Sequence, residues 1–521
     1  MEKVSKQEIL NIITKRIKSF KEGYRQNLSI LGRDDDELNY LIENYILNQK
    51  VSNLIYIHID PLYLTPTQIF KNILFSSLSQ YLNTSASLDS LLSKIQTFLP
   101  STFNYAKDIL KTKATKFSQI LEVINKFINE SQKRCLLLVK NFTFFEEIFK
   151  DFYESFSKFL ILQNKCMVVL FDSYIEKAKK IINSKFNLLF GGFQILFLDI
   201  FSFWDSYLYL TNHLQPQKFS PHFIAFFIQN LKSNLFYHYI FTQRIKKVSQ
   251  NFFLEEEEII FKVFNELMHL KHSVFFQKFM HKLNFLKEKY KDYQDLIEIL
   301  LLISQGYIRK NDLLFFLKMD KNKFQQKIKR LCEIEYVENL GNIYKISDEL
   351  FSFWLSKIFR LHSSGSSFDT SCKIAIFEKK MREEFSLFKE EFYKERIQKV
   401  LELFSSFKND TLIFNEQRLN FPSLERIKVI TYPEQDLKLL IGEGKDIVIV
   451  GIKEGESKEE DIYNFIKRSR LIKNRNLKKI FISLGEVSDS VKLIAKKDKI
   501  LLWEREELNK ILRIYNKAIV L

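Results

Sequence analysis

The sequence predicts an α/β protein with two separate sheets and a mostly helical region between them. Apolar, β-branched runs alternate with amphipathic segments through the first 200 residues, which is the pattern of a parallel sheet with crossover helices. Residues 205–290 carry no strand signal, and short strands return after residue 410. With 521 residues, 46% of them hydrophobic, the chain is long enough for several packed domains.

Five strands are expected in the first sheet, each followed or preceded by a helical segment. The helix over 65–82 has the clearest start, because Thr65 can cap it and Pro66 suits its first turn. The other expected helices are 35–48, 117–132, 144–160 and one that runs through Ile182. The expected strands are 28–31, 53–60, 134–142, 165–173 and 194–200.

The pattern of residues 293–350 differs from that of the helices expected over 205–290. Three helices, the third capped by Asp320, precede a hairpin with a Gly-Asn turn. This order is typical of a winged helix-turn-helix. The segment LHSSGSSFDTS (361–371) then predicts a linker, and a long charged helix leads into a second α/β domain. The domain boundaries that follow are 1–204, 205–290 as a helical lid, 291–360, a linker over 361–375, and 376–521.

Composition favours a polyanionic partner. The formal net charge is +17 and the pI is near 9.3, which points first to nucleic acid and second to an anionic membrane surface. Lysine enrichment on a solvated surface, as an AT-rich genome produces, is the alternative.

The four cysteines lie far apart and form no CxxC pair, so we expect neither a zinc knuckle nor a disulfide framework. The first ten residues are charged rather than signal-like. The most apolar stretch, 186–204, is interrupted by two glycines and Asp199, so it suits buried strand and loop better than a membrane span. A cytoplasmic protein without membrane contact is therefore expected.

The opening of the chain resembles AAA+ ATPases of the archaeal and origin-initiator type. The residues that carry the resemblance are YRQNLSILGRDDDELNYLIENYI and, after them, NLIYIHIDPLYLTPTQIFKNIL. It covers roughly residues 1–290 and implies a P-loop parallel sheet with a helical lid. The segment IYKISDELFSFWLSKIF (343–359) likewise resembles the winged-helix end of these proteins.

The phosphate loop that the resemblance implies is degenerate. A working loop reads GxxxxGK[ST], whose backbone, lysine and hydroxyl bind phosphates and Mg²⁺. Counting from Gly32, the one nucleotide-binding position retained, Glu37 replaces the second glycine, Leu38 the lysine and Asn39 the hydroxyl. Phosphate would also meet the like charges of Asp34 to Asp36.

The second ATPase motif is lost as well. A metal-binding strand should end in Asp-Glu, but the strand over 134–142 presents Lys140 and Asn141 there. The hypothesis is a domain that neither binds nor hydrolyses ATP, with no cofactor; ATP and Mg²⁺ would enter only if the degenerate sites retain function. The acids of RDDDEL can simply stabilise a helix start, and an acidic partner or metal site is the alternative.

The third helix of the winged-helix pattern is rich in cations. If it enters a major groove, its basic side chains face phosphates or base edges, with Lys345 on the wing beside them. Packing against another protein is the alternative role of such a module. The helix residues predicted to contact DNA are Lys321, Lys323, Lys327, Lys329 and Arg330.

The segment PEQDLKLLIGEGKDIVIVGIKEGE (433–456) resembles the core of PD-(D/E)xK nucleases, which are restriction-endonuclease-like. The resemblance covers about residues 380–521. It implies that Asp436 is a metal ligand and that Lys453 assists the attacking water. Gly451 stands where a second acid belongs, although Glu443, Glu454 or Glu456 could supply a displaced carboxylate. No metal site is otherwise predicted.

A second basic segment, KRSRLIKNRNLKK (467–479), offers further phosphate contacts. The predicted residues are Arg468, Arg470, Lys473 and Arg475. A solvated helix face is the alternative. Three functions follow: a DNA-binding or scaffolding protein without ATP hydrolysis, a metal-dependent nuclease with a displaced ligand, or an inactive subunit beside a protein partner such as a paralogous ATPase.

Overall fold

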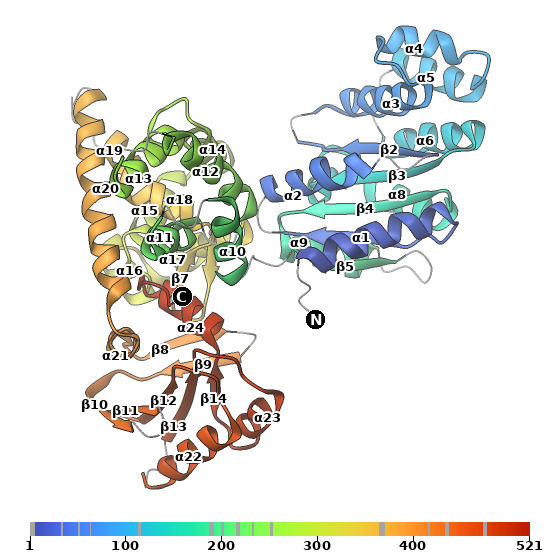
Figure 1. The fold of residues 1–521 in the computed structure, drawn as a ribbon. Helices are drawn as coiled ribbons and strands as arrows, with labels where there is room; N and C mark the ends of the chain where they lie inside the picture. Colours follow the sequence, from blue (N-terminus) through green and yellow to red (C-terminus); the bar gives the residue numbers. More distant parts are fainter. Residues whose placement is uncertain are drawn as a thin grey trace. The chain divides into compact units, whose positions relative to one another are not determined.

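The computed structural model divides the chain into two compact units, Met1–Ile200 and Phe201–Leu521 (Figure 1). The finer division predicted from the sequence remains a prediction. The structure describes residues 6–32, 35–49, 53–62, 64–112, 116–186, 192–198, 203–214, 219–231, 234–250, 254–363, 370–414, 417–432, 437–472 and 477–520.

Unit 1 contains the parallel sheet that the sequence predicts. Its strands run in the order β2-β3-β4-β1-β5, and every neighbouring pair is parallel. Leu28 of β1 lies opposite Val169 of β4, and Cys135 of β3 lies opposite Cys166. The strands are β1 (Asn27–Leu31), β2 (Leu54–Ile59), β3 (Arg134–Lys140), β4 (Cys166–Asp172) and β5 (Phe193–Phe197).

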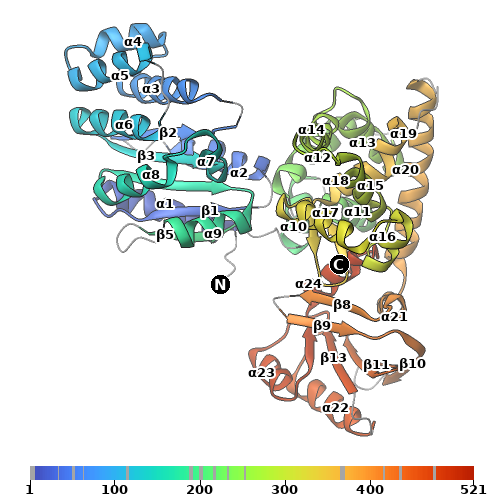
Figure 2. The same cartoon turned by 180° about the vertical axis from the view of Figure 1, so that it is seen from behind.

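The sheet is buried on both faces, as an all-parallel sheet must be. α1 and α2 cover one face and the other helices of unit 1 the opposite face, as the views from front and behind show (Figures 1 and 2). The helices are α1 (Lys6–Lys21), α2 (Asp35–Leu41), α3 (Pro66–Leu82), α4 (Leu88–Ile95), α5 (Pro100–Thr112), α6 (Phe117–Ser131), α7 (Phe145–Ile148), α8 (Phe152–Leu162) and α9 (Ile175–Lys185). α1, α4 and α5 were not predicted from the sequence.

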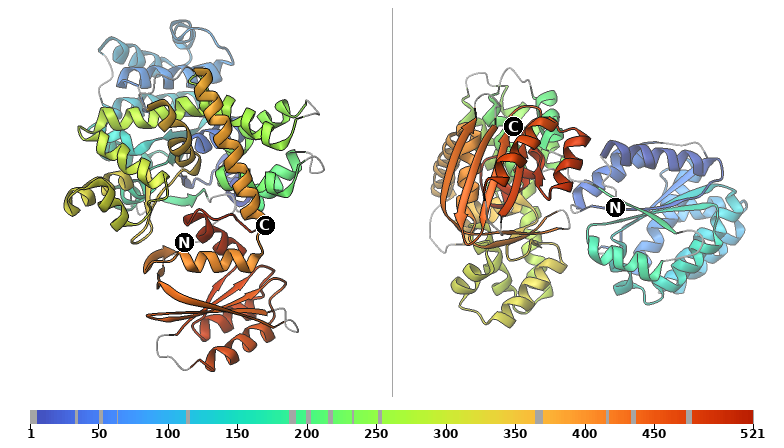
Figure 3. Two further views of the ribbon diagram at one scale, coloured as in Figure 1. Left: turned by 90° about the vertical axis from the view of Figure 1, so that its left-hand side faces the viewer. Right: turned by 90° about the horizontal axis from the view of Figure 1, so that it is seen from below.

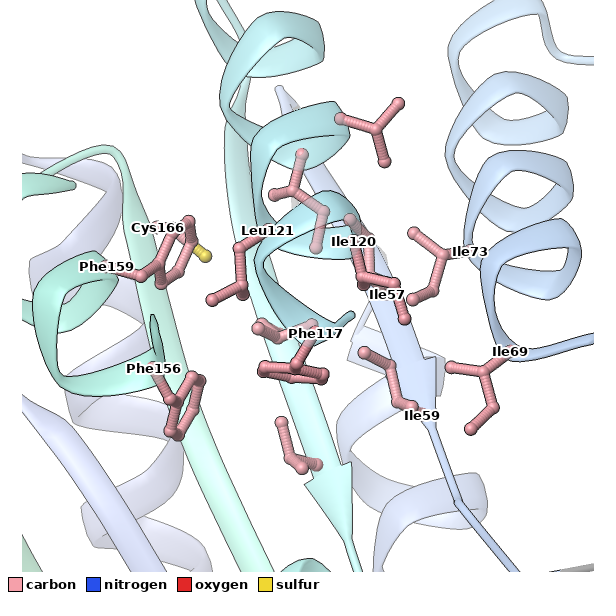
Figure 4. Packing of buried hydrophobic residues seen from close by; sticks show 14 of the residues in the cluster. Ile57, Ile59, Ile69, Ile73, Phe117, Ile120, Leu121, Phe156, Phe159 and Cys166 are labelled. Atoms are coloured by element: carbon pink, nitrogen blue, oxygen red, sulfur yellow. The ribbon is translucent and has the colours of Figure 1, made fainter. Parts of the chain in front are cut away.

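The larger core lies between the sheet and α3, α6 and α8 (Figure 4). Ile57 and Ile59 of β2 face Ile69 and Ile73 of α3, while Phe117 of α6 lies towards the α8 aromatics. α3 begins as predicted: the Thr65 backbone N–H donates to Gln68 Oε1 (2.8 Å) and the Gln68 N–H to Thr65 Oγ1 (3.3 Å).

Unit 2 begins with helices, and three of them precede a two-stranded ribbon where the sequence predicts that order. β6 (Val337–Asn339) and β7 (Tyr344–Ile346) form the antiparallel ribbon. The helices up to it are α10 (Phe203–His213), α11 (Pro221–Leu231), α12 (Leu235–Val248), α13 (Glu256–Phe264), α14 (Val274–Lys289), α15 (Tyr293–Ser304), α16 (Lys310–Leu317) and α17 (Lys321–Glu333).

The predicted linker over 361–375 is helical at both ends. α19 ends at Ser363 and α20 begins at Thr370, and the residues between them lie outside the described residues. α20 is a single long helix, drawn in orange in Figure 3. The helices after the ribbon are α18 (Glu349–Trp354), α19 (Arg360–Ser363), α20 (Thr370–Tyr393) and α21 (Arg396–Ser406).

The last part of unit 2 is a mixed sheet in the order β10-β11-β12-β13-β14. The first two pairs are antiparallel and the last two are parallel. α21 and α24 pack on one face, and α22 and α23 on the other. The elements are β10 (Leu424–Tyr432), β11 (Leu437–Gly444), β12 (Ile447–Lys453), α22 (Glu459–Arg470), β13 (Leu477–Ser483), α23 (Asp489–Lys497), β14 (Leu501–Trp503) and α24 (Arg505–Ile514).

A separate hairpin, β8 (Asp410–Phe414) and β9 (Gln417–Phe421), precedes this sheet. Among the described residues no helix is both long enough and apolar enough to cross a membrane.

Candidate functional site

The carboxyl edge of the unit 1 sheet is where its topology would place a ligand. β1 is followed by α2 on one face, whereas its neighbour β4 is followed by α9 on the other. Open α/β sheets bind ligands where adjacent strands send their chains to opposite faces. Gly32, Asp60, Lys140, Asn141 and Asp172 end or follow strands at this edge.

Gly32 is retained for packing. Its backbone N–H donates to the carbonyl of Asp172 (3.2 Å), and a Cβ atom would lie 3.1 Å from Leu198 Cβ and 3.2 Å from Leu38 Cδ2. Leu38, which holds the position of the phosphate-binding lysine, is fully buried. A lysine there would have to leave the core, so this position is built into the packing of α2.

Lys140, at the end of β3, forms ion pairs with two carboxylates at this edge. Its side chain is only 2% exposed, and Nζ lies 2.5 Å from Asp35 Oδ2 and 3.4 Å from Asp60 Oδ2. Asn141 Nδ2 donates to the Asp60 carboxylate at 3.0 and 3.2 Å. Asn141 adopts a left-handed backbone (φ 51°), which asparagine tolerates better than most residues.

At this edge the acid and the cation stand in the reverse of the positions that the resemblance to ATPases implies. A working ATPase has a cation in the loop and an acid on the strand; here Asp35 follows the loop and Lys140 ends the strand. The cation is held between two carboxylates, so an incoming phosphate would have to displace one of them and would meet both.

Asp172 is a further buried polar group at this edge, and the sequence pattern did not single it out. It is fully buried and accepts hydrogen bonds from the Thr143 N–H (2.9 Å), Thr143 Oγ1 (3.2 Å) and the Tyr174 N–H (2.9 Å). Burial raises the pKa of the Asp172 carboxyl to about 7, and the hydrogen bonds partly oppose this. Its position at the end of a wholly apolar strand was the available signal.

α17 presents a cationic face in unit 2. Lys321, Lys323 and Lys329 are exposed, and Lys329 lies 3.8 Å from Glu333 Oε1. Asp320 caps the helix as predicted, accepting from the Asn322 N–H (2.9 Å) and the Lys323 N–H (3.3 Å). In the described part of the chain, no carboxylate lies within ion-pair distance of Lys321 or Lys323.

Lys327 does not belong to this exposed face, which corrects the sequence prediction. Its side chain is 10% exposed; Nζ is ion-paired with Asp292 and lies 2.9 Å from Asp295 Oδ2. The hydrogen bond from Lys327 lowers the pKa of Asp292. Arg330 is 40% exposed and also contacts Asp292, at 3.0 Å, so it is only partly free for a phosphate.

Lys345 is the second correction. Its ammonium donates to the carbonyl of Arg513 (2.9 Å) and lies 3.0 Å from Glu349 Oε1. Burial is the main cause that lowers the Lys345 pKa. Lys345, which the sequence predicted to contact DNA, is therefore held in an internal ion pair with Glu349.

The β6–β7 ribbon is itself docked on β8. The Asn342 N–H donates to the Thr411 carbonyl (3.1 Å), and the Ile413 N–H to the Leu340 carbonyl (2.9 Å). Gly341 has φ +108°, and a Cβ atom on it would lie 2.2 Å from Thr411 O. The tip of the β6–β7 ribbon is therefore covered by β8.

Of the two predicted nuclease residues, the structure describes Lys453 only. Lys453 Nζ lies 3.4 Å from Asp461 Oδ1, whereas Asp436 lies outside the described residues. Glu454 is held by Lys438 (2.7 Å) and Arg396 (3.1 Å).

Gly451 leaves no room for the missing acid. A Cβ atom there would lie 2.7 Å from Phe465 Cδ2 and 2.9 Å from Phe481 Cδ2. Among the described residues, no group of three or more His, Cys, Asp or Glu side chains could hold a metal ion.

The second basic segment is described only in part. The Arg468 guanidinium lies 3.2 Å from the centre of the Tyr432 ring, and Arg470 Nη2 is 3.7 Å from Asp498 Oδ1. Lys473 and Arg475 lie outside the described residues.

Comparison with known proteins returns resemblance in structure only. No protein-family model matches the chain, and no curated protein matches it in sequence. The Walker-type ATPase of Pyrococcus abyssi is 14% identical, with a TM-score of 0.48 over 68% of this chain and 98% of that one. The Aeropyrum pernix ORC2 protein, solved as ADPNP–ADP complexes, is 11% identical, with a TM-score of 0.41 over 73% and 93%.

A further resemblance is to the Aeropyrum pernix ORC1 protein in complex with DNA. It is 10% identical, with a TM-score of 0.36 over 68% of this chain and 92% of that one. At these TM-scores the likeness adds nothing to what the sheet order itself says about the fold.

Proposed function

We propose that this chain is a DNA-binding protein on an ATPase-like α/β fold that does not hydrolyse ATP. The observation that carries the proposal is the cationic face of α17. Lys321 and Lys323 are exposed, and among the described residues no carboxylate lies within ion-pair distance of either; Lys329 has only a long contact to Glu333. Such cations gain by neutralising phosphates and releasing counterions.

The amides on the same helix suit base contacts. Asn322, Gln325 and Gln326 are exposed among the lysines, and asparagine or glutamine can pair with adenine in the major groove. Phosphate contacts from the lysines would position the helix, and these amides would supply base readout.

Internal charge pairing supports the absence of ATP chemistry. Lys140 is neutralised by Asp35 and Asp60, and the loop lysine is replaced by the buried Leu38. Because Lys140 is already paired with these two carboxylates, it is not available to neutralise a triphosphate.

The triple variant Lys321→Glu, Lys323→Glu, Lys329→Glu tests DNA binding. We expect duplex affinity at 100 mM salt to fall by at least tenfold. The slope of log K against log salt should flatten by about 2 to 3, because each lost phosphate contact removes about 0.9. Fluorescence anisotropy with a labelled 20-base-pair duplex across a salt series measures both quantities.

A matched control is the triple variant Lys94→Glu, Lys107→Glu, Lys111→Glu. These lysines are exposed on α4 and α5, and the change in net charge is identical. Equal losses in the two triple variants would mean that net charge, and not α17, governs binding. Unchanged affinity in the α17 variant would refute the proposal.

A further inference from the structure

Two aromatic side chains on α16 are exposed beside the cationic helix. Phe315 is 76% and Phe316 44% exposed. The Phe316 ring centroid lies 4.2 Å from that of Tyr307 and 5.3 Å from that of Phe315, which meets it edge-on. Tyr307 thus supports Phe316, and Phe316 supports Phe315. We refer to Phe315 and Phe316 as the aromatic pair.

The aromatic pair adjoins the exposed face of α17. Lys310, at the start of α16, donates from Nζ to Gln325 Oε1 on α17 (3.2 Å). Beyond the other end of α16, Lys318 is exposed and lines, together with Lys323, a hollow of about 490 Å³. The carboxylates of Asp292, Asp295 and Asp320 line the same hollow. Cations therefore lie at both ends of α16, and further lysines follow on α17.

The acidic groups near the pair already have roles. Asp320 caps α17 through the N–H groups of Asn322 and Lys323. Asp312 contributes to raising the pKa of Arg309, whose main partner is Asp410. Asp292 and Asp295, which line the hollow beside Lys318, are paired with Lys327. Lys310 and Lys318 therefore place a cation at each end of α16, which suits a ligand that carries planar rings between negative charges.

We propose that the aromatic pair is a stacking platform for unpaired nucleobases, next to the duplex-binding face of α17. Bases of single-stranded DNA stack on exposed aromatic rings while the adjacent phosphates contact cations. Lys310 and Lys318 would contact the phosphates on either side of the stacked base. This inference rests on the proposed DNA binding and names its preferred substrate as strand-opened DNA.

The test uses Phe315→Ala with three labelled probes: a 20-base-pair duplex, the same duplex with a six-base central bubble, and a 20-base single strand. Wild type should bind the bubble more tightly than the duplex. Phe315→Ala should weaken binding of the bubble and the single strand by about tenfold, and leave duplex binding within twofold. Phe98→Ala, which removes a phenylalanine that is 63% exposed in unit 1, should change none of the three.

Two further variants separate stacking from simple apolar contact. Phe315→Trp should retain or strengthen bubble binding, whereas Phe315→Leu should behave like Phe315→Ala. If leucine restores binding, or if Phe315→Ala weakens the duplex equally, the stacking platform is refuted. If Phe315→Ala changes only the sedimentation mass of the protein, the aromatic pair binds protein and the inference is overturned.

The two proposals fail differently. If the α17 triple variant keeps its duplex affinity, the proposed function itself fails. If that variant loses the duplex while Phe315→Ala keeps single-strand affinity, only the stacking platform fails.

Discussion

Single residues decide what the sheet edge of unit 1 can bind. In the folded chain Lys140 neutralises Asp35 and Asp60. Gly32 is fixed by contacts with Leu38 and Leu198. At residue scale, Lys140 and Gly32 thus contribute to ion pairing and packing within the protein. Substitutions there should therefore change the free energy of unfolding.

The Lys140–Asp35 pair should show a measurable coupling. Lys140→Met leaves two acids without their cation, and we expect it to lower the free energy of unfolding by about 2 kcal/mol, since Asp35 and Asp60 are both partly exposed. Asp35→Asn in the same background should restore part of the loss. Urea unfolding of both single variants and the double variant measures this.

An exposed pair provides the control. Lys177 lies 3.8 Å from Glu147 and is 44% exposed, so Lys177→Met should cost no more than about 0.5 kcal/mol. Additive effects of Lys140→Met and Asp35→Asn would contradict the pairing.

Asp172 should give unit 1 a pH-dependent stability. Its pKa is about 7 in the folded chain and about 3.9 when unfolded. In between, the folded state binds a proton that the unfolded state does not, so the contribution is full below about pH 4 and is lost as pH rises through 7. The free energy of unfolding should therefore fall as pH rises, by up to about 1.4 kcal/mol per pH unit.

Asp172→Asn removes this titration. The asparagine leaves the Thr143 N–H without its carboxylate, so the variant is less stable at low pH and only the slope is informative. Urea unfolding at pH 5, 6, 7 and 8 should show a stability difference between wild type and variant that narrows as pH rises. A constant difference would mean that Asp172 does not titrate in this range.

At the scale of elements, the β6–β7 ribbon and α17 have opposite relations to solvent. The ribbon tip is hydrogen bonded to β8, and Arg309 next to it is fixed by Asp410 at 2.8 Å. α17 buries Phe324, Ile328 and Leu331 and exposes its lysines. DNA contact by this region should therefore depend on the helix rather than on the ribbon.

Gly341→Ala tests the docked ribbon. It combines a strained backbone at φ +108° with a Cβ atom 2.2 Å from Thr411 O, and should destabilise unit 2 by at least about 2 kcal/mol. Gly306→Ala is the control, because Gly306 has φ +96° but its nearest side-chain contact is at 3.6 Å. A difference between the two in thermal unfolding isolates the contact with β8, and equal losses would reduce the effect to backbone strain.

At the scale of the whole molecule, the described residues assemble neither the ATPase site nor the nuclease site that the sequence was compared with. At the sheet edge of unit 1, Lys140 is paired with Asp35 and Asp60, and Gly451 in unit 2 is enclosed by Phe465 and Phe481. A net charge of +17 remains, and it favours association with polyanions.

The whole chain should therefore bind DNA without changing it. We expect no Mg²⁺-dependent ATP turnover, and no nicking of supercoiled plasmid with Mg²⁺ or Mn²⁺. Lys453→Ala is the control: cleavage that wild type shows and this variant lacks would reinstate the nuclease, and ATP turnover abolished by Gly32→Val would reinstate the ATPase.

The sequence by itself determined most of the strands and helices, and it predicts that the ATPase motifs are degenerate. Strand and helix periodicity, the Thr65-Pro66 start of α3 and the replacements at residues 37–39 are local patterns, and local patterns can be read along the chain. It could not distinguish Lys321 and Lys323 from Lys327, because one helix turn separates exposed from buried lysines and only the position of Asp292 decides which is paired.

The tertiary structure alone decided where the charges balance. Lys140 and Asp35 are 105 residues apart, Lys345 and Arg513 are 168 residues apart, and the space at Gly451 depends on rings from α22 and β13. Such pairings depend on which strands are neighbours and on what packs over them, so no local pattern encodes them. Strand order and the helix crossovers locate the edge of the sheet, and packing and charge pairing decide what it can bind.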